Sequence, residues 1–166
     1  MAVKQEYRQI VKTATITAGG IGVPGAFSFG VDVVALSGTW AVMILAIASK
    51  SGHEVDKPFA AKLTAGVAAG VGAYIVGSKV ATQLLHLVPI AGTLAAIGIN
   101  SSLNALYTYK VGSAVSVLFD KGGFEEADMA DMMNGLLRVI ATVPTRGEIA
   151  DIILMMTKER PRLEAS

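Results

Sequence analysis

The residues that first suggest chemistry are the glycines of the stretch GGIGVPG at positions 19–25. Gly20, Gly22 and Gly25 follow the G-x-G-x-x-G pattern of loops that hold a dinucleotide phosphate. Such a loop also needs a strand before it, a βαβ unit around it and an acidic residue about 20 positions later. No series of parallel strands follows here, and Pro24 lacks the backbone N–H that would face the phosphate. We therefore interpret Gly22, Pro24 and Gly25 as a close-packed break before an apolar helix, without a bound cofactor.

Two charged residues stand inside apolar stretches. Asp32 lies in FSFGVDVVAL and Lys79 lies in YIVGSKVATQLL. Because an unpaired buried charge is costly, we expect Asp32 to pair with Lys79 or with the amides of Asn100 and Asn104. The structural alternatives are a helix N-cap for Asp32 and an interfacial position from which Lys79 reaches water. The functional alternative is a proton or ion path lined by these four residues.

The other residue types that commonly do chemistry give no further candidate. His53 and His86 are far apart and lack the spacing of metal ligands, and we interpret His53 as a solvated turn residue. The chain has no cysteine and no G-x-x-x-x-G-K-[ST] motif, which excludes thiol chemistry and a P-loop. The acidic residues between positions 125 and 131 fit the start of a helix. We expect no enzyme, no metal site and no cofactor.

The composition points to a chain with too few charges for an ordinary water-facing surface. Of the 166 residues, 52% are hydrophobic and 16% are charged, and the mean hydropathy is +0.55. A typical soluble domain has about 25% charged residues. The chain is therefore expected to lie in or against a lipid bilayer, or to bury its surface in a homo-oligomer. The net charge of +1, without a basic stripe, argues against nucleic-acid binding.

Hydrophobic periodicity predicts an all-α fold in two parts. Residues 1–122 are expected to form a hydrophobic bundle of about four helices, arranged as two helical hairpins. The predicted helices cover residues 3–18, 27–49, 58–86 and 90–119, with the later break at Pro89 and Gly92. The second of these approaches the ~20 apolar residues that cross a bilayer.

Local signals define the third helix in more detail. Asp56 is predicted to cap its start, with Pro58 in its first turn. Gly66 and Gly70 have the small-xxx-small spacing that lets two helix backbones approach closely, and this spacing would support assembly.

The second part, residues 123–166, is predicted to be an amphipathic helical hairpin with a short polar tail. An apolar stripe runs through Met129, Met132, Met133, Leu136 and Leu137. We interpret this stripe as core packing, with a partner-binding groove as the alternative. Thr145 is predicted to cap the last helix after the break at Pro144.

The first half of the hydrophobic part has a Pro-Gly break, an Asp in the next apolar helix, a Met-containing run and a later glycine. The second half has a Pro-x-x-Gly break and then a small-residue helix with a late aromatic residue and a glycine. The positions that carry this pattern are Pro24, Gly25, Asp32, Met43, Ile44, Ala46 and Gly52, and then Pro89, Gly92, Asn100, Tyr109 and Gly112. Over residues 8–120 the chain thereby resembles the YcjF-like bacterial domain family of unknown function. The resemblance implies a membrane-associated module without established catalysis, often linked to a dynamin- or Era-like GTPase. The C-terminal hairpin is not part of that pattern.

These observations lead us to expect a non-enzymatic, membrane-associated helical module that self-assembles and recruits a partner. The resemblance implies a GTPase-linked partner and the cytoplasmic membrane of a bacterium, with the C-terminal hairpin in the cytoplasm. The first alternative is an oligomeric pore or proton path. The second is a soluble scaffold that buries its apolar helices in a homo-oligomer.

Overall fold

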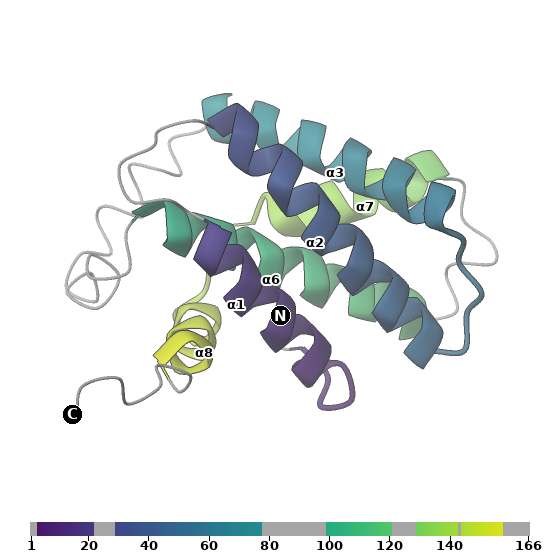
Figure 1. Cartoon of the computed structure of the whole chain (residues 1–166), viewed down its shortest axis with the longest axis horizontal. Coiled ribbons are helices and arrows are strands. Elements are labelled where there is room, and N and C mark those ends of the chain that lie inside the picture. The colour runs from purple at the N-terminus through teal and green to yellow at the C-terminus, as the bar shows by residue number, and fades with distance from the viewer. Residues whose placement is uncertain (1–2, 22–28, 78–98, 121–128, 143, 158–166) are drawn as a thin grey trace.

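The computed structural model describes residues 3–21, 29–77, 99–120, 129–142 and 144–157, and this part of the chain is a packed all-α bundle (Figure 1). The expectation of a helical bundle is confirmed, and the described residues contain no strand. The helices are α1 (Arg8–Ile21), α2 (Phe29–Lys50), α3 (Lys57–Gly77), α6 (Ile99–Asp120), α7 (Met129–Ile140) and α8 (Arg146–Thr157).

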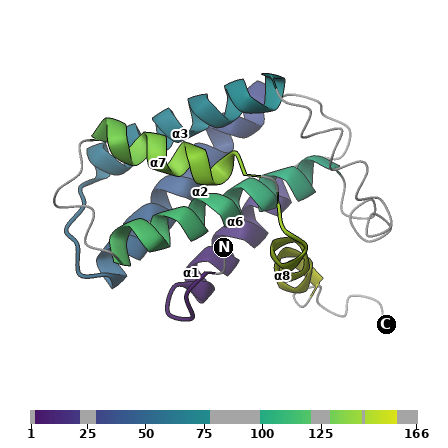
Figure 2. The same ribbon diagram turned by 180° about the vertical axis from the view of Figure 1, so that it is seen from behind.

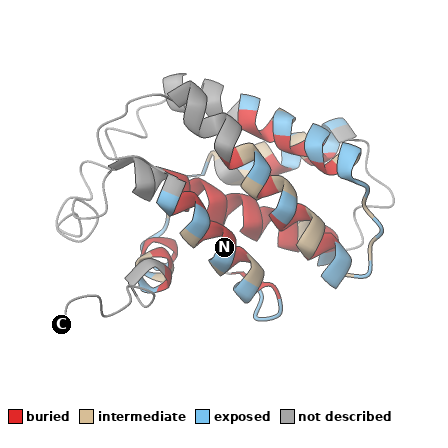
Figure 3. Cartoon of the chain, in the orientation of Figure 1, coloured by how far each residue is buried: buried red, intermediate tan, exposed pale blue. Residues whose placement is uncertain are grey.

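Helix α6 is the centre of the bundle. It packs against α1, α2, α7 and α8, while α3 lies on the outer side against α2 and α7 (Figures 1 and 2). Every residue from 104 to 116 of α6 is buried, as the colouring in Figure 3 shows. A helix buried on all sides needs close neighbours on all its faces, and small side chains along α6 provide room for them.

One such close approach is at Gly112, where three helices meet. A Cβ added to Gly112 would lie 2.8 Å from Val11 Cγ2 on α1 and 2.9 Å from Met43 Sδ on α2. Only a residue without a side chain lets α1 and α2 lie this near to the α6 backbone. Gly112 therefore sets the spacing of α1, α2 and α6.

Helices α2 and α3 form a hairpin through the turn at residues 51–56. Gly52 has a φ of 80°, a left-handed conformation that glycine adopts without strain. The Phe59 amide donates a 2.8 Å hydrogen bond to Asp56 Oδ1, which confirms Asp56 as the cap of α3. Pro58 lies in the first turn, where its missing N–H costs no helix hydrogen bond.

Helices α7 and α8 lie on different sides of α6. Helix α7 packs on α3 and α6, whereas α8 packs on α1 and α6 (Figure 2). The predicted cap of α8 is confirmed, because the Glu148 amide donates to Thr145 Oγ1 at 3.2 Å. In return, Glu148 Oε2 accepts from the Thr145 amide at 2.7 Å, which completes a capping box.

Several sequence expectations lie outside the described residues or differ from the structure. Helix α1 begins at Arg8 and continues through Gly20 to Ile21, because consecutive helical hydrogen bonds tolerate glycine at a helix end. Among the described residues, no helix combines the length and the hydropathy that crossing a membrane requires. The expected breaks and one expected charge lie outside the described ranges: Gly22, Pro24, Gly25, Lys79, Pro89 and Gly92.

Candidate functional site

The polar residues of α6 lie inside the bundle, where apolar residues are the rule. Those that are buried are Asn104, Thr108, Lys110, Ser113 and Ser116. Polar groups at such depth are costly unless neighbouring helices supply hydrogen-bond partners. Trp40 on α2 bonds to Thr108, Thr142 before α8 bonds to Lys110, and Ser116 bonds within α6, so two of these residues link α6 to elements distant in sequence.

Lys110 is the most deeply buried charged residue in the described part of the chain, with 2% of its surface exposed. Its ammonium donates to the backbone oxygen of Thr142, and also to Thr142 Oγ1 at 3.0 Å. Burial lowers the pKa of Lys110, and the nearby Glu148 carboxylate opposes this shift. Lys110 therefore holds the segment between α7 and α8 from the centre of the bundle.

Tyr109 and Arg8 meet the same carboxylate on α8. The Tyr109 hydroxyl donates to Asp151 Oδ2 at 3.1 Å, and Arg8 Nη2 lies 3.4 Å from Asp151 Oδ1. Burial of the phenol, followed by the negative charge of Asp151, raises the pKa of Tyr109 to about 12. Tyr109 is thus a neutral donor at physiological pH, and Asp151 is the acceptor shared by α1 and α6.

Glu148 is the second acidic residue of α8 that faces the bundle, with 7% of its surface exposed. Burial alone raises the pKa of its carboxyl group, but the hydrogen bonds from the Thr145 amide and hydroxyl are among the contacts that outweigh this and lower it. Glu148 is therefore ionised, and its charge lies close enough to Lys110 to influence the pKa of that lysine. The carboxylates of Glu148 and Asp151 both meet polar groups of the bundle.

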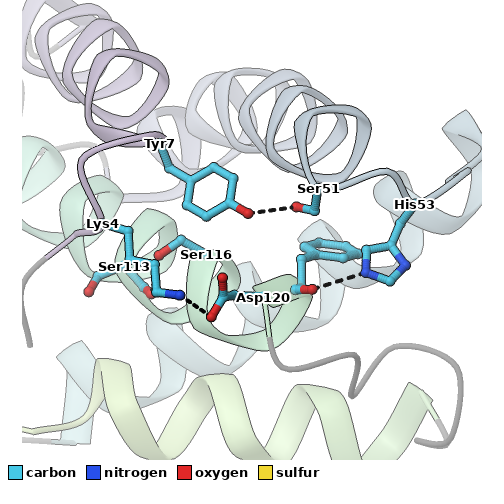
Figure 4. Close-up of polar contacts among 8 residues, drawn as sticks. Lys4, Tyr7, Ser51, His53, Ser113, Ser116 and Asp120 are labelled. Atoms are coloured by element: carbon cyan, nitrogen blue, oxygen red, sulfur yellow. Dashed lines mark hydrogen bonds and ion pairs between the residues drawn. The ribbon is translucent and has the colours of Figure 1, made fainter.

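A second polar cluster joins the N-terminal segment, the α2–α3 turn and the end of α6 (Figure 4). Lys4 forms an ion pair with Asp120, and the Tyr7 hydroxyl donates to Ser51 Oγ at 3.2 Å. His53 Nε2–H donates to the Phe119 carbonyl at 2.9 Å, with the two rings 5.5 Å apart. His53 was expected to be a solvated turn residue; it is half-buried, because its ring bonds to and packs against Phe119 at the end of α6.

The polar groups of both clusters hold helices and turns of the bundle together. His53, Tyr109, Lys110 and Lys4 each connect one helix or turn to another through a hydrogen bond or an ion pair. Among the described residues, no three histidine, aspartate or glutamate side chains gather as metal ligands. We take the first cluster as the candidate functional site, and define it as Arg8, Tyr109 and Lys110 with Glu148 and Asp151.

The comparisons with known proteins add no relative. No protein-family model, no curated protein and no solved structure matches the chain. The resemblance to the YcjF-like family therefore stays a prediction, and function must be argued from the residues themselves.

Of the four residues expected to form a buried polar path, only Asn104 has a described side chain. Asp32 lies on α2 and Asn100 on α6, but their side chains lie outside the described part, as does Lys79. Asn104 is buried, and within the described ranges its Nδ2 has no hydrogen-bond partner; the same holds for Thr15 Oγ1 on α1. The proposed pairing of Asp32 with Lys79 stays a prediction.

Gly66, from the small-xxx-small spacing, packs against Met133 of the apolar stripe. A Cβ at Gly66 of α3 would lie 2.5 Å from Met133 Cε on α7, so these helices touch within one chain. In the apolar stripe, Met132 and Leu136 are buried, whereas Met133 and Leu137 are half-buried. Met129 and Gly70 lie on α7 and α3, and their surroundings are outside the described part.

Sequence reasoning did not identify the site that α6 and α8 form together. Lys110 lies within the helix predicted over residues 90–119, but nothing near it in sequence indicates Thr142 or Glu148 as neighbours. One signal was present in α8, where Glu148 and Asp151 recur at helical spacing among Ile149, Ile152 and Met155. Acids on the apolar face of a helix indicate a partner surface with donors.

Proposed function

We propose that the chain is a non-enzymatic helical module that associates with a membrane through the outer faces of α2 and α3, self-assembles and recruits a partner. The cytoplasmic membrane of a bacterium and a GTPase-linked partner belong to this proposal through the resemblance to the YcjF-like family alone. The orientation with the C-terminal helices in the cytoplasm is part of the same proposal.

The observation that carries the proposal is the placement of α2 relative to α6. Helix α2 has only two charged residues in 22, Asp32 and Lys50; it packs against α1, α3 and α6, yet it leaves Gly38 and Val42 exposed. Helix α6, which is rich in polar residues, lies at the centre. In water, the reverse order buries more apolar surface. Contact of the exposed face of α2 with lipid would remove from water the apolar surface that this arrangement leaves exposed.

The outer faces of α2 and α3 supply such a contact surface. Val42 is 68% exposed, and a Cβ at Gly38 one turn before it would meet no atom within 4 Å. On α3, Ala61, Ala65 and Ala69 are exposed, and Figure 3 shows exposed positions along both helices. Apart from Lys62, which is exposed on α3, the surface is apolar and free of large projections, which suits shallow contact with acyl chains.

Charge contributes little to this proposed contact. Lys50 and Lys57 are exposed at the turn between α2 and α3, but Glu54 and Asp56 are exposed beside them. Two cations and two anions in one turn give no net attraction to an anionic surface. Binding that rests on apolar burial is expected to change little with salt.

Liposome flotation of the full chain tests the proposal. The wild-type chain is expected to float with vesicles of phosphatidylglycerol and phosphatidylcholine, and Val42→Glu is expected to stay in the dense fractions. Leu154→Glu is the matched control, because Leu154 on α8 is the other exposed large hydrophobic residue in the described part (52% exposed). A wild-type chain that never floats, or a Val42→Glu chain that floats equally well, contradicts membrane association through this face.

The soluble scaffold is the second candidate, because the same outer face can bury itself against another copy. It predicts a large, monodisperse particle in detergent-free buffer and no flotation. A pore lined by Asp32, Lys79, Asn100 and Asn104 stays a prediction, since three of these side chains lie outside the described part.

A further inference from the structure

Helix α8 occupies a surface that α1 and α6 present on the side of the bundle opposite to α3 and α7 (Figures 1 and 2). Its buried face carries Glu148, Ile149, Ile152 and Met155. The surface beneath offers the guanidinium of Arg8 and the hydroxyl of Tyr109 to Asp151, and the ammonium of Lys110 lies near Glu148. Donors on one side and acids at i and i+3 on the other make the contact complementary in charge and in spacing.

The connection to α8 is short and is held at one point. Helix α7 ends at Ile140 and α8 begins at Arg146, and Pro144 lies between them. The point of attachment is Thr142, whose backbone and hydroxyl oxygens both accept from the buried Lys110. Since burying a lysine is costly, a lysine at this depth must supply something that an apolar residue cannot. Here Lys110 holds Thr142 in the position from which α8 packs on α1 of the same chain.

We propose that the surface formed by Arg8, Tyr109 and Lys110 is a docking site for an acidic amphipathic helix, and that α8 of a second copy is the helix it accepts. Two copies would exchange their α8 helices about Thr142, and Lys110 would hold the segment in the unexchanged form.

A second copy is the occupant that fits because its Asp151 can meet Arg8 and Tyr109, and its Glu148 can lie near Lys110, as they do within one chain. Exchange is reciprocal, so it closes into a two-fold dimer and leaves no helix uncovered. The main contacts of α8 are with α1 and α6, and therefore its departure leaves the packing of α2, α3 and α7 in place. This inference rests on the self-assembly part of the proposed function and does not depend on lipid.

The first test measures the molar mass of the full chain by light scattering over a range of concentrations in lipid-free buffer. Lys110→Met keeps an unbranched side chain of similar length but removes the hydrogen bonds to Thr142. Because only the unexchanged form has these bonds, Lys110→Met is expected to lower the dimer dissociation constant by about tenfold or more. Lys57→Met, at an exposed lysine, is the control and is expected to match the wild type.

Should Lys110→Met fail to fold, Thr142→Val provides the same test from the other partner. Thr142 is exposed, and valine removes one of the two acceptors while keeping the shape of the side chain. A smaller shift toward dimer is expected. Molar masses that stay monomeric in the wild type and in both variants overturn the proposal.

The second test shows whether a dimer has exchanged α8. The chain contains no cysteine, so introduced thiols are unique. One chain carries Arg8→Cys and the other Asp151→Cys, a pair in direct contact; in the mixed exchanged dimer the reciprocal Arg8–Asp151 pair stays intact. After mixing in the Lys110→Met background, a short bis-maleimide is expected to link the two chains. Ser49→Cys in place of Arg8→Cys is the control and is expected not to link.

The outcomes separate this inference from membrane association. A dimer without cross-linking between the Arg8→Cys and Asp151→Cys chains overturns the exchange, whatever the flotation result. A cross-linked dimer in a chain that does not float supports the exchange and contradicts the lipid contact.

Discussion

The indole of Trp40 on α2 donates a 2.8 Å hydrogen bond to the hydroxyl of Thr108 on α6, and both side chains are buried. The two residues are 68 positions apart in the chain, so this bond fixes the register of two helices that local sequence does not connect. Thr108→Val keeps the shape of the side chain and leaves the indole N–H without a partner. We expect it to lower the free energy of unfolding by about 1–3 kcal/mol.

Trp40 is the only tryptophan, so intrinsic fluorescence reports this bond directly. Thr108→Val is expected to shift the emission of the folded state to shorter wavelength, while Thr108→Ser, which keeps the hydroxyl, retains the wild-type wavelength. An emission spectrum and a urea midpoint that both equal those of the wild type in Thr108→Val would show that the bond contributes nothing.

Gly112→Ala tests the three-helix contact around α6. The added methyl would lie 2.8 Å from Val11, whose branched side chain is stiff, so α1 or α6 must move. We expect a net loss of about 1–2 kcal/mol, since overpacking exceeds the helix-propensity gain of alanine. Gly38→Ala on α2 is the control: its methyl meets open space, and the variant should be more stable by ~0.5–1 kcal/mol. Equal effects of the two variants in chemical denaturation would contradict the close approach.

Gly66→Ala tests whether the contact of α3 with α7 is adaptable. The atoms in the way are Sδ and Cε at the end of the flexible Met133 side chain, 2.6 and 2.5 Å from the added Cβ. We therefore expect a loss of less than about 1 kcal/mol, smaller than that of Gly112→Ala. A double-mutant cycle with Met133→Ala should show coupling between the two sites. Additive effects would mean that the residues do not touch.

Alkaline pH is expected to weaken the docking of α8 through Tyr109. Its pKa is raised from 10.0 to about 12 by burial and by Asp151, so its contribution to stability is complete below pH 10 and is lost as pH rises to 12. The loss is on the order of 1–2 kcal/mol. Tyr109→Phe should flatten this part of the stability profile measured by denaturant titration, although Lys110, with its lowered pKa, acts in the opposite direction. A profile that Tyr109→Phe leaves unchanged would contradict the proton held between Tyr109 and Asp151.

Acid pH is expected to act through Glu148. The pKa of this carboxyl group lies below its ordinary value of 4.5, so its contribution is present above pH 4.5 and declines as pH falls through the lowered value. Glu148→Gln should be less stable than the wild type at pH 7, and the difference should shrink toward pH 3. Asp131→Asn, at an exposed acid of α7, is the control and should change the free energy of unfolding at pH 7 by less than Glu148→Gln does. A Glu148→Gln deficit that stays constant with pH would contradict an ionised Glu148 in the capping box.

The sequence by itself determined the helical class and several helix ends of this protein. Periodic apolar residues predict helices, and the caps at Asp56 and Thr145 follow from side chains that bond to amides three residues later. These features depend on contacts within a few residues, and short-range contacts are the ones that spacing encodes. The prediction for His53 was less successful. A solvated turn residue was expected, but its ring is half-buried against Phe119 at the end of α6.

Only the tertiary structure decided which helix stands at the centre and which polar groups meet there. Hydropathy favours α2 for the interior, but α6 occupies it, and Trp40 on α2, Thr142 before α8 and Asp151 on α8 supply partners for its buried polar groups. Lys110 is 32 positions from Thr142, and Tyr109 is 42 positions from Asp151. No local pattern links the members of either pair. Their pairing depends on how whole helices pack, and packing is set by the fit of all faces at once.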